Sequence, residues 1–161
     1  MGGDPFPSEL LDEWGVKLRT IGKEFETTTG RVRRCGWLDL NVLKYSVDVT
    51  SSTAINLTKL DILDTFPEIK VAVAYRHPVT KEKIEGFPAD LDLLEKVEVE
   101  YVVLKGWLKP IGQCRSFYDL PLAVSNFGNF YFLYTNPIIQ CREYVDFIEK
   151  FVGEYQIHWN R

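Results

Sequence analysis

Two stretches in which apolar residues recur at every second position constrain the fold of this chain most strongly. They span residues 69–75 and 97–103, and their apolar members are Ile69, Val71, Val73 and Tyr75, then Val97, Val99, Tyr101 and Val103. A period of two places alternate side chains on one face of an extended chain, so each stretch predicts a β-strand. Glutamates interrupt the second stretch, which should be half-buried and end at Gly106 and Trp107.

Apolar residues at helical spacing precede and follow these strands in the sequence. A first helix is predicted from Leu10, Trp14, Leu18, Ile21 and Phe25, with Ser8 as its N-cap and Gly22 near its end. A second should begin at the cap Asp39, bury Leu40, Leu43 and Val47, and close at Ser51 and Ser52. We also expect a short strand at 54–58, a turn at 77–80 with a returning partner at 83–84, a helical turn at 91–96 and a helix at 142–152. Helices and strands alternate, which predicts the α/β class.

Composition limits the possible functions. The 161 residues suffice for one domain with a core, and the formal charge of −4 argues against general nucleic-acid binding. Cys35, Cys114 and Cys141 are odd in number and widely spaced, so we expect neither a disulfide framework nor a zinc site, and a reducing cytoplasmic compartment fits. The sequence shows no secretory signal pattern. Its longest apolar run, near 127–139, is interrupted by polar residues and proline, so no membrane span is expected.

Residues 27–37 combine three threonines, three arginines and two glycines, of which Gly30 lies between the threonines and the arginines. Arginine forks match the geometry of carboxylate and phosphate, and Gly30 permits a sharp turn close to a ligand. The stretch therefore predicts an anion-binding loop. A solvated basic turn is the alternative that these residues alone leave open.

Thr58-Lys59-Leu60-Asp61 follows the predicted strand 54–58. A carboxylate can accept two hydrogen bonds from guanine, which adenine cannot donate, while a lysine stem packs across the base. Lys59 and Asp61 thus predict guanine recognition, with a solvated turn as the alternative. Asp61 and Asp64 could also hold a metal, although a capped turn explains them as well. The sequence contains no G-x-x-x-x-G-K-[ST] and no nucleophile–histidine pair, which indicates a ligand site without a reaction centre.

Several segments in order resemble the C-terminal part of the adenylosuccinate synthetase family. They are residues 5–10, 28–39, 57–64, 69–75, 106–107 and 119–121. The resemblance implies the C-terminal part of a P-loop-like nucleotide-binding ligase fold, with a mixed sheet and flanking helices. It also implies a cytoplasmic, homodimeric carbon–nitrogen ligase that joins L-aspartate to IMP at the expense of GTP, with Mg²⁺, in AMP synthesis.

The resemblance also assigns site residues. The loop that closes on L-aspartate would consist of Thr27, Thr28, Thr29, Gly30, Arg31, Val32 and Arg33. Arg31 would also reach IMP, Arg33 the GTP phosphates, and Lys59, Leu60 and Asp61 the guanine. The family's phosphate loop, catalytic residues and Mg²⁺ ligands lie in an N-terminal half that this chain lacks, so no catalytic or metal residue is predicted here.

Three departures from the family shape the expectation for this chain. By this resemblance, Glu26 stands where the family usually has glycine. Residues 124–140 match nothing in the family and are predicted to be a translated intron, with a genuine surface insertion as the alternative. The chain also stops at Arg161, before a further segment that contacts guanine in the family. We expect one partial domain over residues 1–161 that is inactive alone. The alternatives are a fragment that binds guanine nucleotides or full-length subunits, and a poorly folding product whose strands 54–58 and 97–103 lack neighbours.

Overall fold

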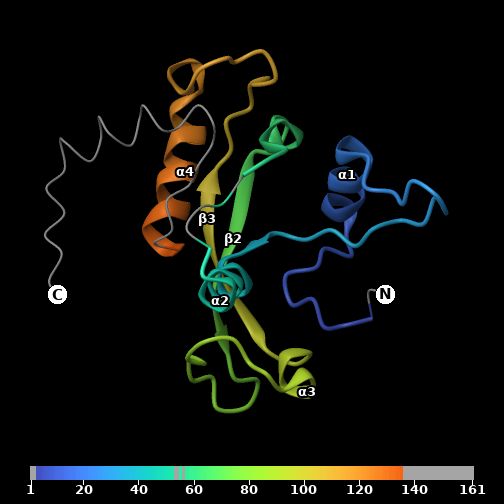
Figure 1. The fold of residues 1–161 in the computed structure, drawn as a ribbon, viewed down its shortest axis with the longest axis vertical. Helices are drawn as coiled ribbons and strands as arrows, with labels where there is room; N and C mark the ends of the chain where they lie inside the picture. Colours follow the sequence, from blue (N-terminus) through green and yellow to red (C-terminus); the bar gives the residue numbers. More distant parts are fainter. Residues whose placement is uncertain (1–2, 53–54, 56, 136–161) are drawn as a thin grey trace, which may run out of the picture.

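The computed structural model describes residues 3–52, 55 and 57–135. Along the chain its elements are α1 (Glu13–Gly22), β1 (Leu38–Asp39), α2 (Leu40–Thr50), the 3-10 turn η1 (Leu60–Leu63), β2 (Glu68–Arg76), α3 (Leu91–Leu94), β3 (Glu98–Lys105), the 3-10 turn η2 (Phe117–Asp119) and α4 (Leu122–Thr135). In Figure 1, β2 and β3 run side by side through the centre, with α1 and α4 on opposite sides. The predicted α/β class is confirmed.

The sheet is mixed and has the order β1-β2-β3. β1 pairs in parallel with β2, and β2 pairs antiparallel with β3, so that Ile69 faces Leu104. The register shifts between Ala72 and Ala74, where Val73 is an extra residue in β2. β2 is buried continuously from Val71 to Tyr75, because it is the central strand, whereas β3 is only half-buried, as its alternation predicts.

The core is centred on Phe66, which is fully buried. The ring of Trp14 lies 5.1 Å from that of Phe66, and Trp37 meets Phe66 edge-on at 6.0 Å. On the α4 side, Val124 and Phe127 are also buried, and Phe127 packs against Trp107. Part of the predicted insertion 124–140 is therefore helical and contributes to the core, while its origin as a translated intron stays a prediction.

The start of the first helix differs from the sequence expectation. Asp12, not Ser8, is the N-cap, and its carboxylate accepts from the amides of Trp14 at 3.0 Å and Gly15 at 3.2 Å. Residues 8–10 pair instead with residues 35–37: the Trp37 amide donates to the Ser8 carbonyl, and the Leu10 amide to the Cys35 carbonyl. This long-range pairing keeps the segment extended, so the helix can begin only afterwards. Gly22 ends it as predicted.

The second helix begins at Asp39 and closes at Ser51, as predicted. The turn after β2 also returns as predicted, since Arg76 bridges Lys83. The strand expected at 54–58 is wrong for its described members: Ile55, Leu57 and Thr58 are not in a strand, because the two apolar residues pack on the core from an irregular segment. The predicted helix 142–152 and Cys141 lie outside the described residues.

Candidate functional site

The predicted anion-binding loop is a hairpin, which we call the Thr/Arg hairpin and define as residues 24–33. Phe25 and Val32 form an antiparallel bridge, the Glu26 amide donates to the Arg31 carbonyl, and the Gly30 amide donates back to the Glu26 carbonyl, both at 2.9 Å. Gly30 has φ of +67°, a left-handed conformation that other residues adopt at a cost. The sharp turn expected at Gly30 is therefore present.

Every side chain from Thr27 to Arg33 is exposed, and the hairpin projects from the body beside α1 (Figure 1). Near the tip, the Thr29 hydroxyl donates to the Glu26 carboxylate, and the Arg31 amide donates to the Thr29 hydroxyl at 3.3 Å. Glu26 is thus engaged inside the tip. Arg31 and the threonines are placed where a small anion could reach them.

The three arginines of the stretch differ in their contacts. Arg34 is tied to the N-terminal segment: its guanidinium pairs with Glu9 at 2.6 Å, donates to the Asp4 carbonyl at 2.7 Å and lies over the Phe6 ring. Its hydrogen bond holds the pKa of Glu9 below the usual range. Arg34 anchors the base of the loop, which leaves Arg31 and Arg33 as the ligand candidates.

The second predicted motif forms one turn beside α1. Lys59 has a left-handed backbone, with φ of 60°, and precedes η1. Leu60 packs against the core cluster, whereas the Asp61 carboxylate is exposed. The Lys59 ammonium points back to α1, where it donates to the Gly22 carbonyl at 3.1 Å. A turn, not a strand end as predicted, presents Lys59 and Asp61.

Glu24 joins the two motifs, and the sequence reasoning missed it. One carboxylate oxygen pairs with the Lys59 ammonium, and the other lies 3.6 Å from the Arg33 guanidinium. Glu24 and Arg33 also pair through the backbone, since the Arg33 amide donates to the Glu24 carbonyl at 3.0 Å. The predicted phosphate-binding and guanine-binding cations are thus brought to one place.

Asp64, for which the sequence left a metal ligand and a capped turn open, makes structural contacts. Its carboxylate accepts from the Trp107 indole at 2.8 Å and from the Ile111 amide at 3.2 Å. It therefore ties η1 to the chain that follows β3. Within the described part of the chain, no three His, Cys, Asp or Glu side chains cluster as metal ligands, and no helix is long and apolar enough to cross a membrane.

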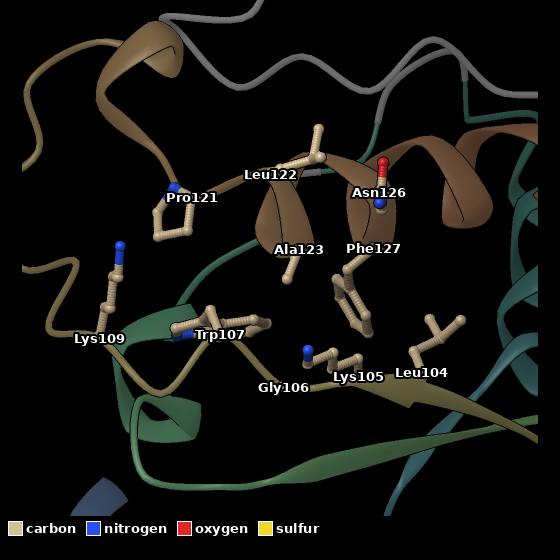
Figure 2. A pocket seen from close by; sticks show the side chains of 10 residues that line it. All are labelled: Leu104, Lys105, Gly106, Trp107, Lys109, Pro121, Leu122, Ala123, Asn126 and Phe127. Carbon is tan, nitrogen blue, oxygen red and sulfur yellow. The ribbon is translucent and has the colours of Figure 1, made fainter.

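Two further features are the Cys35 thiol, which lies beside the hairpin and donates to the Arg33 carbonyl at 3.7 Å, and a cavity. Burial raises the pKa of the Cys35 thiol, which therefore is not an activated nucleophile. A cavity of about 410 Å³ opens between the end of β3 and α4, as Figure 2 shows. It is lined by Leu104, Lys105, Gly106, Trp107, Lys109, Pro121, Leu122, Ala123, Asn126 and Phe127. None of the predicted site residues lines it.

The chain is similar to known proteins of one family. The family model described as adenylosuccinate synthetase matches residues 1–159. Adenylosuccinate synthetase of Neurospora crassa is 54% identical over 153 residues, covering 95% of this chain and 32% of that protein. The enzyme of that name from Phaeosphaeria nodorum is 46% identical over 159 residues, covering 99% of this chain and 33% of that protein.

A solved structure has the same fold. The structure of fully ligated adenylosuccinate synthetase from Plasmodium falciparum superposes with a TM-score of 0.83 at 36% identity, over 86% of this chain and 33% of that chain. The chain spans about a third of the length of the curated relatives it matches.

Proposed function

The chain belongs to the adenylosuccinate synthetase family, and we propose that it carries the L-aspartate loop and the guanine-binding segment of an IMP–aspartate ligase. The reaction of the whole ligase would join L-aspartate to IMP, with GTP converted to GDP and phosphate, in cytoplasmic AMP synthesis. The observation that carries the proposal is the junction of Arg33 and Lys59 at Glu24, with the exposed Asp61 two residues after Lys59 in the chain.

Each proposed contact has a physical reason. The guanidiniums of Arg31 and Arg33 are both exposed, and they would pair with the carboxylates of L-aspartate and with the phosphates of IMP and GTP, because their planar forks bind such oxygens in pairs. Asp61 would accept two hydrogen bonds from guanine. Thr27, Thr28 and Thr29 would supply hydroxyls, and Gly30 permits the sharp turn at the tip of the hairpin.

Mg²⁺ is the cofactor expected for the family. The described residues offer no cluster of three metal-ligating side chains, so they do not fit a metal site of their own, and no step of the proposal runs through one. The sequence also has no phosphate-cradling G-x-x-x-x-G-K-[ST]. Since phosphoryl transfer depends on those parts, we propose that this chain alone forms no adenylosuccinate in a coupled assay with GTP, IMP, L-aspartate and Mg²⁺.

Guanine recognition is tested by titrating the 161-residue chain with GDP and with ADP in a calorimeter. GDP should bind at least about tenfold more tightly than ADP, because adenine lacks the two donors that the carboxylate oxygens of Asp61 would accept from guanine. Asp61→Asn should remove this preference, while the matched control Asp92→Asn, at another exposed carboxylate on a short helix, should keep it. Equal binding of GDP and ADP by the unaltered chain would contradict the proposal.

Binding to another subunit is a second candidate function, which exposed apolar side chains favour. Leu11 is 87% exposed, and Val16 on α1 and Val32 on the hairpin are also largely exposed. The surrounding chain of a larger assembly, including the homodimer expected for the family, would cover such side chains. Analytical ultracentrifugation of the chain mixed with a full-length family member would detect the complex, and independent sedimentation of the two would exclude it.

A further inference from the structure

Glu24 stands at the end of α1 and contacts both ligand-binding candidates that come from different parts of the chain. Its side chain is only 24% exposed, compared with 56% for Arg33 and 52% for Lys59. From this geometry we propose that Glu24 is a positioning residue, which holds the Arg33 guanidinium and the Lys59 ammonium in register for one guanine nucleotide. The inference rests on the proposed function, because the nucleotide defines what the two cations must reach together.

The backbone around Glu24 is fixed by contacts with α1. The Glu24 amide donates to the Arg19 carbonyl at 2.9 Å, and the Arg19 side chain in turn donates to the Arg33 carbonyl at 2.9 Å. A Cβ at Gly22 would lie 3.4 Å from the Glu24 side chain and 3.5 Å from Ile62 of η1. The carboxylate therefore emerges from a closely packed junction of α1, the hairpin and η1, and its direction is set before any ligand binds.

Lys59 shows why such a holder is needed. The Lys59 side chain has several freely rotating bonds, and the left-handed backbone of this residue begins a turn. Without a partner, the side chain would extend into solvent. Glu24 and the Gly22 carbonyl, at the negative end of α1, fix the ammonium on two sides. The stem is then held in one conformation, which lowers the entropy cost of placing it across a base.

The charge balance also favours positioning over competition with the ligand. Glu24 carries one negative charge and is shared by two cations, so the group of three remains positive by one charge. A phosphate approaching Arg33 therefore meets a net attraction, although a carboxylate is nearby. If Glu24 only competed with phosphate for the two cations, the ligand would displace it, and removing its charge would strengthen phosphate binding.

The test combines chemical labelling with nucleotide binding in Glu24→Gln, which keeps the shape but removes the charge. Lysine acylation by an N-hydroxysuccinimide ester and arginine modification by phenylglyoxal are quantified by mass spectrometry at Lys59 and Arg33. We expect Lys59 to react about fivefold faster and Arg33 about threefold faster, as suits partly exposed ion pairs. GDP affinity should fall about fivefold, and the shortened carboxylate of Glu24→Asp should give intermediate values.

The sheet supplies a matched control. Glu98 pairs with Lys81, which, like Lys59, is about half exposed and has a left-handed backbone. Glu98→Gln should accelerate acylation of Lys81, leave Lys59 unchanged and leave GDP affinity unchanged. Circular dichroism confirms that each variant retains the fold.

Each outcome decides between distinct claims. Unchanged labelling of Lys59 and Arg33 in Glu24→Gln would overturn the positioning role. Faster labelling with unchanged or tighter GDP binding would overturn it as well, while leaving the proposed nucleotide site in place. If the unaltered chain binds no GDP, the proposed function is refuted. Faster labelling in Glu24→Gln would then limit Glu24 to an ionic link between the hairpin and η1.

Discussion

The Thr/Arg hairpin and the β2–β3 pair are both antiparallel, but different forces hold them. In the sheet pair, β2 is buried at Val71 and Tyr75 in the same core as Phe66, and backbone bonds join it to the half-buried β3 along most of its length. The hairpin has one bridge, a few turn hydrogen bonds and the ionic contacts of Glu24, with exposed side chains from residue 27 to 33. Hydrophobic burial thus specifies the scaffold, whereas the ligand surface depends on partly screened charges and on backbone turns.

The largest expected effect tests the sheet side of this comparison. Phe66→Ala should lower the free energy of unfolding by about 3–5 kcal/mol, because it leaves a cavity beside the rings of Trp14 and Trp37. Val32→Ala, at an apolar residue of the hairpin that is 62% exposed, should change it by less than about 0.5 kcal/mol. Urea unfolding measures both. Equal losses would mean that the hairpin is part of the cooperative core.

A glycine substitution at the end of β3 should have the next largest effect. A Cβ at Gly106 would lie 1.8 Å from the Phe66 carbonyl oxygen, a backbone atom that cannot move freely. Gly106→Ala should therefore cost about 3 kcal/mol. Gly112→Ala is the control, since a Cβ there meets nothing within 4 Å. A cost for Gly106→Ala below about 1 kcal/mol, measured by urea unfolding, would show that the two segments can separate.

The same contrast explains what the sequence could predict. The strands 69–75 and 97–103 and the cap Asp39 follow local patterns of spacing and residue type, and the structure confirms them. The prediction of Ser8 as a cap is wrong because its segment pairs with residues 35–37, far along the chain. The prediction of a strand at 54–58 is wrong for its described members, because Ile55 and Leu57 pack on the core without sheet partners.

The sequence predicts the parts of the site but not their assembly. Arg33 and Lys59 stand out by their chemistry and by family resemblance. Glu24 does not, because its role depends on contact with a residue 35 positions away and on the left-handed backbone of Lys59. Asp64 likewise gains its role from Trp107, 43 positions away. Periodicity carries no signal for such pairs.

Alkaline pH should lower the free energy of unfolding through a contact of the sheet, and by less than the two substitutions above. The Tyr75 hydroxyl donates to the buried Asp39 carboxylate at 2.6 Å, and burial, followed by this contact, raises the pKa of Tyr75 above its ordinary value of 10.0. The folded state therefore favours the protonated phenol. Its contribution is complete below about pH 10 and is lost as the pH rises above the pKa of the unfolded tyrosine.

Tyr75→Phe tests this linkage. It should cost about 1–2 kcal/mol at about pH 8, because Asp39 loses one donor but keeps those of Asn41 and Val42. Between about pH 9.5 and 11.5 the unaltered chain should lose stability more steeply than Tyr75→Phe in urea unfolding. Tyr118→Phe, at a tyrosine that is 66% exposed, is the control and should retain the steeper loss. Identical pH slopes for all three would contradict the linkage.

The smallest expected effect tests the hairpin itself. Gly30 has φ of +67°, and a Cβ there would meet nothing within 4 Å, so Gly30→Ala adds only backbone strain of about 1 kcal/mol. The hairpin can relieve this strain by opening locally, because few contacts oppose it. Hydrogen exchange at the amides of residues 26 and 30 should accelerate about fivefold, corresponding to that strain, while the urea midpoint stays unchanged. A drop in the midpoint as large as that of Gly106→Ala would instead place the hairpin in the same cooperative unit as the sheet, and the contrast between the two antiparallel pairs would fail.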